Sequence, residues 1–254
     1  MENSKGNLTS GGIPRACELA SRIVQRVQLL ALFDLDNTLI DRQGALHDWA
    51  CDFVSARGLP VVAARAITDA LDARACPSDF ARIKVALGLH DSVDSLWGAY
   101  VAGMARRARC QQGVREGLWG MKAGGWAIGI ATNGAPDIQH AKLEGAGLAE
   151  LVDGVCASGE VGTRKPDRAV FEEAARRCGA RLEDGGWMVG DNPGIDVEGG
   201  RKAGLQTLWI SAGRQWPDGV DSPYVTALNA LDAVRYLSRR GRSRSTRPSS
   251  GHIS

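Results

Sequence analysis

Four apolar segments of this sequence each end in a short polar cluster, and this repeated pattern limits the folds open to the chain. The first segment, 31–36, begins with three apolar residues and ends in Asp-Leu-Asp. Segment 126–131 is followed by Thr-Asn-Gly, 187–189 by Gly-Asp-Asn, and 206–210 by Ser-Ala-Gly. Short apolar runs of this kind are typical of buried parallel strands. A weaker run covers residues 151–156.

Helical segments lie between these runs. In residues 165–178 the apolar positions recur at helical spacing, Pro166 suits a first helical turn, and Gly179 follows as a stop signal. Strands that alternate with helices pair with one another in parallel. The sequence therefore predicts an α/β fold with a doubly wound, Rossmann-like sheet. Ligands of such sheets bind beyond the carboxyl ends of the strands, where the polar clusters are expected to meet.

The first strand is followed by an insertion. Thr132 follows Asp34 by 98 residues, whereas one βα unit needs about 30. Apolar residues within the extra segment recur at i, i+3, i+4 and i+7, which predicts helices. We therefore expect a helical cap over residues 42–111, inserted into an α/β core formed by 29–41 and 112–235.

The two ends of the chain are polar. We expect an N-terminal extension over residues 1–28 and a basic disordered tail over 236–254. Five arginines and no acid lie within 239–254, and the other 26 basic residues against 29 acidic ones leave residues 1–238 at −3. Because that body is not basic, we do not expect nucleic acid as a partner.

The composition favours a folded protein of the cytoplasm. Of 254 residues, 44% are hydrophobic and 24% charged, which excludes a low-complexity chain. No apolar run approaches the roughly 18 residues that span a bilayer, and no signal segment is recognisable, so no membrane association is expected. The six cysteines form no CxxC pair, which favours reduced thiols.

Acidic residues follow two of the expected strands. Asp34 and Asp36 are one residue apart, so alternation places both on the same side of the backbone. Such close carboxylates repel unless a cation lies between them, and oxygen ligands favour Mg²⁺. Asp191 and Asp196 form a second cluster that converges on the first. The alternatives are a solvated strand end for the first pair and a capped turn for the second.

Two further clusters suit an anionic ligand. Thr132, Asn133 and Gly134 lie where a strand passes into a helix, so their N–H groups and a hydroxyl face an anion there. Lys165 would neutralise a phosphoryl group beside the carboxylates. A capping turn and a solvated lysine are the alternatives.

Taken together, these motifs resemble the four-motif signature of the haloacid dehalogenase superfamily. They are DxDxT (Asp34, Asp36, Thr38), Thr132-Asn133-Gly134, Lys165-Pro166, and GDNPxxD over 190–196. The resemblance is to the phosphatase branch with a cap after the first motif, like the phosphoglycolate phosphatases. Gln139, Lys142 and Leu143 also resemble a common pattern of that superfamily.

The resemblance implies a role for each matching residue. Asp34 would be the nucleophile that forms an aspartyl-phosphate, and Asp36 would protonate the leaving oxygen and then deprotonate water. Thr132 and the Asn133 amide would hold the phosphoryl oxygens, while Lys165 would neutralise charge.

The resemblance also implies a Mg²⁺ site. Asp34, Asp191 and the backbone carbonyl of Asp36 would bind the ion, and Asp196 would orient Lys165 or a metal-bound water.

Substrate contacts are expected from both sides of the site. Asn133 and Gly134 would contribute from the core, and Arg42 and His47 from the start of the cap. A surface position on a helix is the alternative for His47.

The function implied is a magnesium-dependent hydrolase that cleaves a small-molecule phosphate monoester. Asp36 favours a phosphatase, since dehalogenases of this superfamily lack the second acid. A phosphotransferase or sugar-phosphate mutase, and a non-catalytic binding protein, are the alternatives, and the oligomeric state is left open.

Overall fold

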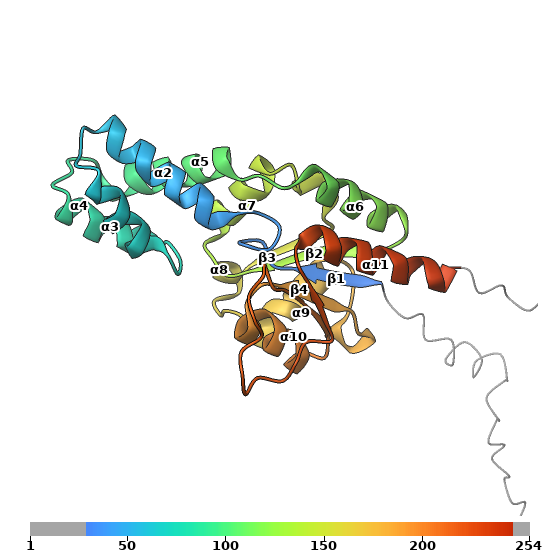
Figure 1. The fold of residues 1–254 in the computed structure, drawn as a ribbon. Coiled ribbons are helices and arrows are strands. Elements are labelled where there is room, and N and C mark those ends of the chain that lie inside the picture. Colours follow the sequence, from blue (N-terminus) through green and yellow to red (C-terminus); the bar gives the residue numbers. More distant parts are fainter. Residues whose placement is uncertain (1–28, 246–254) are drawn as a thin grey trace, which may run out of the picture.

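The fold is built on one parallel sheet. The structure is a computed structural model that describes residues 29–245 (Figure 1). Within this range six strands pair in the order β3-β2-β1-β4-β5-β6. The strands are β1 (Leu30–Phe33), β2 (Ala127–Thr132), β3 (Gly154–Ala157), β4 (Trp187–Gly190), β5 (Gln206–Ile210) and β6 (Val225–Ala227). The predicted doubly wound α/β fold is confirmed.

The strand order reverses between β1 and β4. From β1 the chain adds β2 and β3 on one side, and β4, β5 and β6 on the other. All pairs are parallel. The helices therefore leave the two central strands in opposite directions, which opens a crevice at the carboxyl ends of β1 and β4.

Both faces of the sheet are buried. Leu30 and Leu32 pack toward one face, and Ala31 and Phe33 toward the other, as expected from the alternation of a strand. The first face is covered by α9 (Arg168–Arg177) and α10 (Gly199–Lys202), and the second by α6 (Gln112–Ala123) and α11 (Ala230–Ser245). This double burial explains why the strands read as continuous apolar runs.

Four helices follow β1 and lie together beside the sheet (Figure 1). They are α2 (Arg42–Ala56), α3 (Val62–Leu71), α4 (Pro77–Ala86) and α5 (Val93–Arg107). Their apolar faces enclose a separate cluster rich in aromatic rings, with Trp49, Phe80 and Tyr100 in mutual contact. Ile138 of α7 (Pro136–Gly145) joins this cluster and attaches the four helices to the core.

Short helical turns complete the chain: η1 (Ala149–Leu151), α8 (Ser158–Val161), η2 (Leu182–Asp184) and the π-helical turn η3 (Pro193–Glu198). Helix α9 begins at Arg168, two residues later than Pro166, because the Asp167 side chain accepts a hydrogen bond from the Ala169 N–H and caps it. Strand β6 has three residues, too few for the sequence pattern to mark.

The structure corrects the expectation that a disordered tail begins at residue 236, because residues 236–245 are helical. Helix α11 continues to Ser245, and Leu237 is fully buried against the sheet. The Arg240 guanidinium lies over the rings of Tyr236, Tyr224 and Trp187. The basic residues at the start of this segment thus belong to an amphipathic helix whose apolar face packs on the core.

Some expectations cannot be compared with the fold. The predicted extension over 1–28 and the last part of the tail, 246–254, lie outside the described residues. Between residues 29 and 245, no helix is both long and apolar enough to cross a membrane.

Candidate active site

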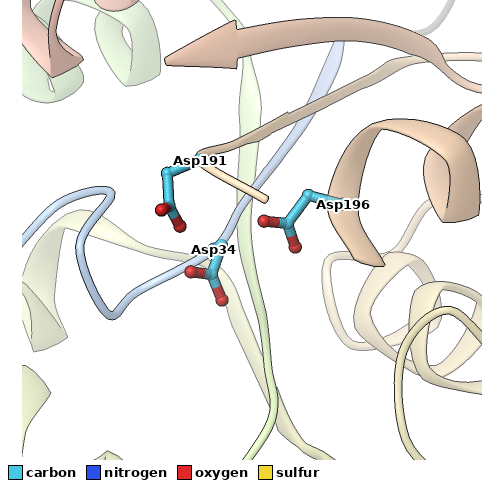
Figure 2. A group of neighbouring side chains, drawn as sticks. All are labelled: Asp34, Asp191 and Asp196. Carbon is cyan, nitrogen blue, oxygen red and sulfur yellow. The ribbon is translucent and has the colours of Figure 1, made fainter. Parts of the chain in front are cut away.

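Three carboxylates meet at the carboxyl ends of the central strands. Asp34 directly follows β1, Asp191 directly follows β4, and Asp196 lies in η3. One oxygen from each lies within 4.8 Å of the others, and Figure 2 shows the three side chains pointing toward a common space. The reversal of strand order therefore creates the cluster, because it places the ends of β1 and β4 side by side.

Local backbone features hold this arrangement. The Asp34 N–H donates to the Val189 carbonyl at 2.8 Å, which continues the pairing of β1 with β4 by one residue. Asn192 caps η3 through its side chain and donates its own N–H to Asp196 Oδ2 at 3.0 Å. Gly190 has to lack a side chain, because a Cβ there would collide with the Asp196 carboxylate.

A buried lysine links two of the carboxylates. Lys165 Nζ lies 2.8 Å from Asp34 Oδ1 and 2.7 Å from Asp196 Oδ1. The Asn133 side chain fixes the lysine backbone, since its Oδ1 accepts from the Lys165 N–H at 2.9 Å and its Nδ2 donates to the Lys165 carbonyl at 3.0 Å. The segment after β2 thus positions the lysine that follows α8.

The electrostatics of the cluster favour a bound cation. Burial raises the pKa of Asp34 to about 7, with Lys165 opposing the shift and Asp196 adding to it. Burial and the charge of Asp196 likewise raise the pKa of Asp191 to about 6. Burial disfavours the charged form of Lys165, but Asp196 and Asp34 outweigh it and raise the lysine pKa. Arg214, whose guanidinium lies 3.2 Å from Asp191 Oδ2, and Lys165 oppose the rise in the pKa of Asp191. Three ionised carboxylates against these two cations still leave a deficit of positive charge, and an all-oxygen donor set of this kind suits Mg²⁺.

Asp36 lies apart from the three carboxylates. It lines the same cleft as Asp34, but its carboxylate does not belong to the cluster. Both Asp36 oxygens instead lie 2.7 Å from Lys142 Nζ. Gln139 Nε2 donates to Thr132 Oγ1 at 2.6 Å and to Asp36 Oδ2 at 3.3 Å, and so joins the two halves of the site.

These groups line one cleft of about 150 Å³ between the sheet and the four inserted helices. The cleft contains nine of the residues predicted for the site: Asp34, Asp36, Arg42, Thr132, Asn133, Gly134, Lys165, Asp191 and Asp196. Their roles as nucleophile, acid, ligand or substrate contact stay predictions.

Three predicted substrate contacts have other partners. His47 does not line the cleft but lies on the exposed face of α2 beside Cys51, and its contact with substrate stays a prediction. Arg42 lines the cleft, but its guanidinium donates to the carbonyls of Leu71 and Asp72 at 2.6 Å each. The Gly134 N–H donates to Ser158 Oγ.

The chain matches the model of the haloacid dehalogenase-like hydrolase family over residues 31–210. It belongs to this family. The match contains the sheet from β1 to β5 together with the inserted helices, and the expected family resemblance is confirmed.

Curated relatives of the chain include enzymes named as phosphatases and nucleotidases. The chain is 46% identical over 99 residues to a phosphoserine phosphatase of Thermus thermophilus, which is 39% of each protein. It is 37% identical over 109 residues to a pyrimidine 5′-nucleotidase of Escherichia coli, or 42% of this chain and 48% of that enzyme. The matches to these curated relatives therefore span less than half of their length.

The same fold is found in a hydrolase of this superfamily from Bacillus subtilis whose structure contains magnesium. The two chains are 18% identical, with a TM-score of 0.62 over 83% of this chain and 98% of the other. At this identity the likeness shows the shared fold alone.

Several cleft residues of this family member have no predicted role in the sequence analysis. Lys142 and Gln139 form part of a recognised pattern there, but nothing in the sequence pairs them with Asp36. Tyr100 and Arg74 line the cleft from the inserted helices, where helical spacing indicates only that Tyr100 is buried. Contacts between segments so distant in the chain leave no local signal.

Proposed function

We propose that this protein is a magnesium-dependent phosphatase that hydrolyses a small phosphate monoester through an aspartyl-phosphate. The observation that carries the proposal is the position of Asp34. Its carboxylate lies at the end of the central strand, within a carboxylate cluster, and contacts the buried ammonium group of Lys165. A carboxylate so placed can attack a phosphoryl group whose charge the lysine helps to offset.

In the first step, an Asp34 oxygen forms a bond to phosphorus while the bond from phosphorus to the ester oxygen breaks. The leaving oxygen takes a proton from Asp36. Lys142 and Gln139 orient Asp36 from one side of the cleft. The Thr132 hydroxyl, held by Gln139, would support the phosphoryl oxygens.

In the second step, Asp36 takes a proton from a water molecule, and the resulting hydroxide attacks phosphorus. The bond between phosphorus and Asp34 breaks, which releases inorganic phosphate and restores the carboxylate. One residue thus acts first as acid and then as base.

The carboxylates of Asp34 and Asp191 and the backbone carbonyl of Asp36 would hold Mg²⁺. The ion would supply positive charge against the repulsion between a carboxylate and a phosphate dianion. Asp196 is less available as a direct ligand, because Lys165 and the Asn192 N–H engage its two oxygens. It would act by keeping Lys165 in place.

Helices α2–α5 would serve as a cap over the site. Residues from α2, α5 and the α3–α4 loop line the cleft opposite the strand ends. The small volume of the cleft supports a metabolite-sized ester rather than a protein or polynucleotide substrate.

A phosphate-release screen tests the proposal. Purified protein is incubated with a panel of phosphorylated metabolites, with Mg²⁺ or with EDTA, and the wild type is compared with Asp34→Asn. The matched control is Asp48→Asn, which removes an exposed carboxylate of α2 outside the cleft. We expect release that requires Mg²⁺, is lost in Asp34→Asn and is retained in Asp48→Asn.

The intermediate can be detected independently. After an acid quench, intact-mass measurement should show a phosphoryl adduct on the wild type and none on Asp34→Asn. Phosphate release by Asp34→Asn at the wild-type rate would refute the nucleophile, and failure to release phosphate from any ester would refute the function. Transfer to an added sugar hydroxyl in place of water would instead identify a phosphotransferase.

A further inference from the structure

The cleft contains more positive charge than the proposed chemistry uses. Five cationic side chains line it: Arg42, Arg74, Lys142, Arg164 and Lys165. The phosphoryl group and the metal ion of the proposed reaction would occupy only the part of the cleft around Asp34 and Lys165. The partners of each cation therefore show which charges remain available to a ligand.

Three of the five are already engaged. Lys165 contacts the carboxylates of Asp34 and Asp196. Lys142 binds both oxygens of Asp36. The Arg42 guanidinium donates to two backbone carbonyls at the end of α3. All three side chains are buried, so these pairings are fixed parts of the protein.

The other two cations, Arg74 and Arg164, are neither buried nor paired within residues 29–245. Arg74 lies in the loop between α3 and α4, and Arg164 directly precedes Lys165 on the core side, and both are exposed. Within residues 29–245 neither guanidinium has a hydrogen bond or ion pair. Asp72, the acid nearest to Arg74 in the chain, accepts a hydrogen bond from Gln43 instead.

The two guanidinium groups also act on each other. Partial burial and the positive charge of Arg74 lower the pKa of Arg164. Two like charges from different segments at one cleft repel, and an anion bound by both would remove that repulsion. A guanidinium presents a planar array of donors that matches a carboxylate or a phosphate group.

We propose that Arg74 and Arg164 form a second anion subsite, so that the preferred substrate is a phosphate ester with a second acidic group. The inference rests on the proposed phosphatase activity and deepens it. The phosphoryl group would lie at Asp34, and the second carboxylate or phosphate would lie between the two arginines at the mouth. Because one arginine belongs to the inserted helices and the other to the core, such a substrate would also bridge the two parts.

Matched pairs of esters test this subsite. Each pair differs only in the second acidic group: phosphoglycolate against ethyl phosphate, 3-phosphoglycerate against glycerol phosphate, and a sugar bisphosphate against the corresponding monophosphate. The first two pairs place a carboxylate at different reach, and the third distinguishes a second phosphate from a carboxylate. Phosphate release with Mg²⁺ gives kcat and KM for each.

We expect the wild type to prefer the two-anion member of at least one pair by about tenfold or more in kcat/KM. In Arg74→Gln and Arg164→Gln, the KM for that ester should rise on the order of tenfold, with a smaller change in kcat. The ratio of kcat/KM between the two members should fall toward one. Arg74→Lys should recover part of the preference, because it restores the charge without the planar donor array.

The control variant is Arg65→Gln, which removes an exposed arginine of α3 that pairs with Asp69 and does not line the cleft. It should keep the wild-type ratio. Equal kcat/KM for both members of every pair, or an unchanged ratio in Arg74→Gln and Arg164→Gln, would overturn the subsite and leave the phosphatase assignment standing. Absence of phosphate release from every ester would refute both.

Discussion

Replacing Asp34 by Asn should stabilise the metal-free protein while it abolishes turnover. The Asp34 carboxylate is only 8% exposed and shares the cluster with two other acids. Asn keeps the oxygen that accepts from Lys165 but removes one of the crowded negative charges. We therefore expect the Asp34 carboxylate, the proposed nucleophile, to lower the stability of the fold when no cation is bound.

The magnitude follows from the buried charge. The pKa of Asp34 lies at about 7, against an ordinary value of 3.8. One pKa unit corresponds to about 1.4 kcal/mol, so keeping Asp34 ionised in the folded protein at pH 8 costs up to about 4 kcal/mol. Allowing for the weaker contact of Lys165 with a neutral amide, we expect Asp34→Asn to raise the free energy of unfolding by about 2–4 kcal/mol.

The pH dependence has a definite sign. The pKa of Asp34 is higher in the folded protein than in the unfolded chain. The contribution of protonated Asp34 to the free energy of unfolding is therefore fully present below about pH 4 and is lost as the pH rises to about 7. The advantage of Asp34→Asn should accordingly be complete above pH 7, fall by about half at pH 5.5, and vanish below pH 4.

Urea denaturation in EDTA, followed by tryptophan fluorescence at pH 5.5 and pH 8, measures this difference. Asp48→Asn should change the free energy of unfolding by less than about 0.5 kcal/mol. With saturating Mg²⁺ the difference in free energy of unfolding between Asp34→Asn and the wild type should become smaller, because the ion stabilises the wild type more than a variant that lacks one ligand. A variant no more stable than the wild type in EDTA at pH 8 would refute the reasoning.

Three other perturbations test the surroundings of this group. Lys142→Met removes the nearer of two buried cations from the Asp36 carboxylate and leaves only the Arg42 guanidinium at 3.9 Å, so the free energy of unfolding should fall by about 1–3 kcal/mol in urea denaturation and kcat should fall with it. Asn133→Ala removes two hydrogen bonds to the Lys165 backbone and should cost about 1–3 kcal/mol of stability, while steady-state kinetics shows kcat reduced more than KM is raised. Chelation of Mg²⁺ should stop phosphate release and lower the thermal midpoint, and titration with Mg²⁺ should restore both.

Much of the sheet could be predicted from the sequence. Buried parallel strands must be apolar on both faces, so β1, β2, β4 and β5 appear as continuous apolar runs near their observed positions. Strand β6 and the full length of α11 were missed. The first is very short, and the arginines of the second conceal an apolar face that becomes evident only once it packs on the sheet.

The composition of the candidate site was also accessible in part. Asp34, Thr132, Lys165 and Asp191 follow strand ends or precede a helix, and parallel strands bring such positions to one edge. The pattern could not assign partners to them. His47 lies outside the cleft because two residues close in sequence, Arg42 and His47, face different sides of one helix.

The sequence by itself determined which residues end strands and which begin helices, since those choices depend on local hydrophobicity, proline, glycine and capping side chains. The tertiary structure decided which charges face one another. It paired Asp36 with Lys142 across 106 positions of the chain, and it brought Arg74 and Arg164 to one cleft without an ion-pair partner among residues 29–245. Electrostatic partners depend on distance in space, and only the packing of the inserted helices on the sheet sets those distances.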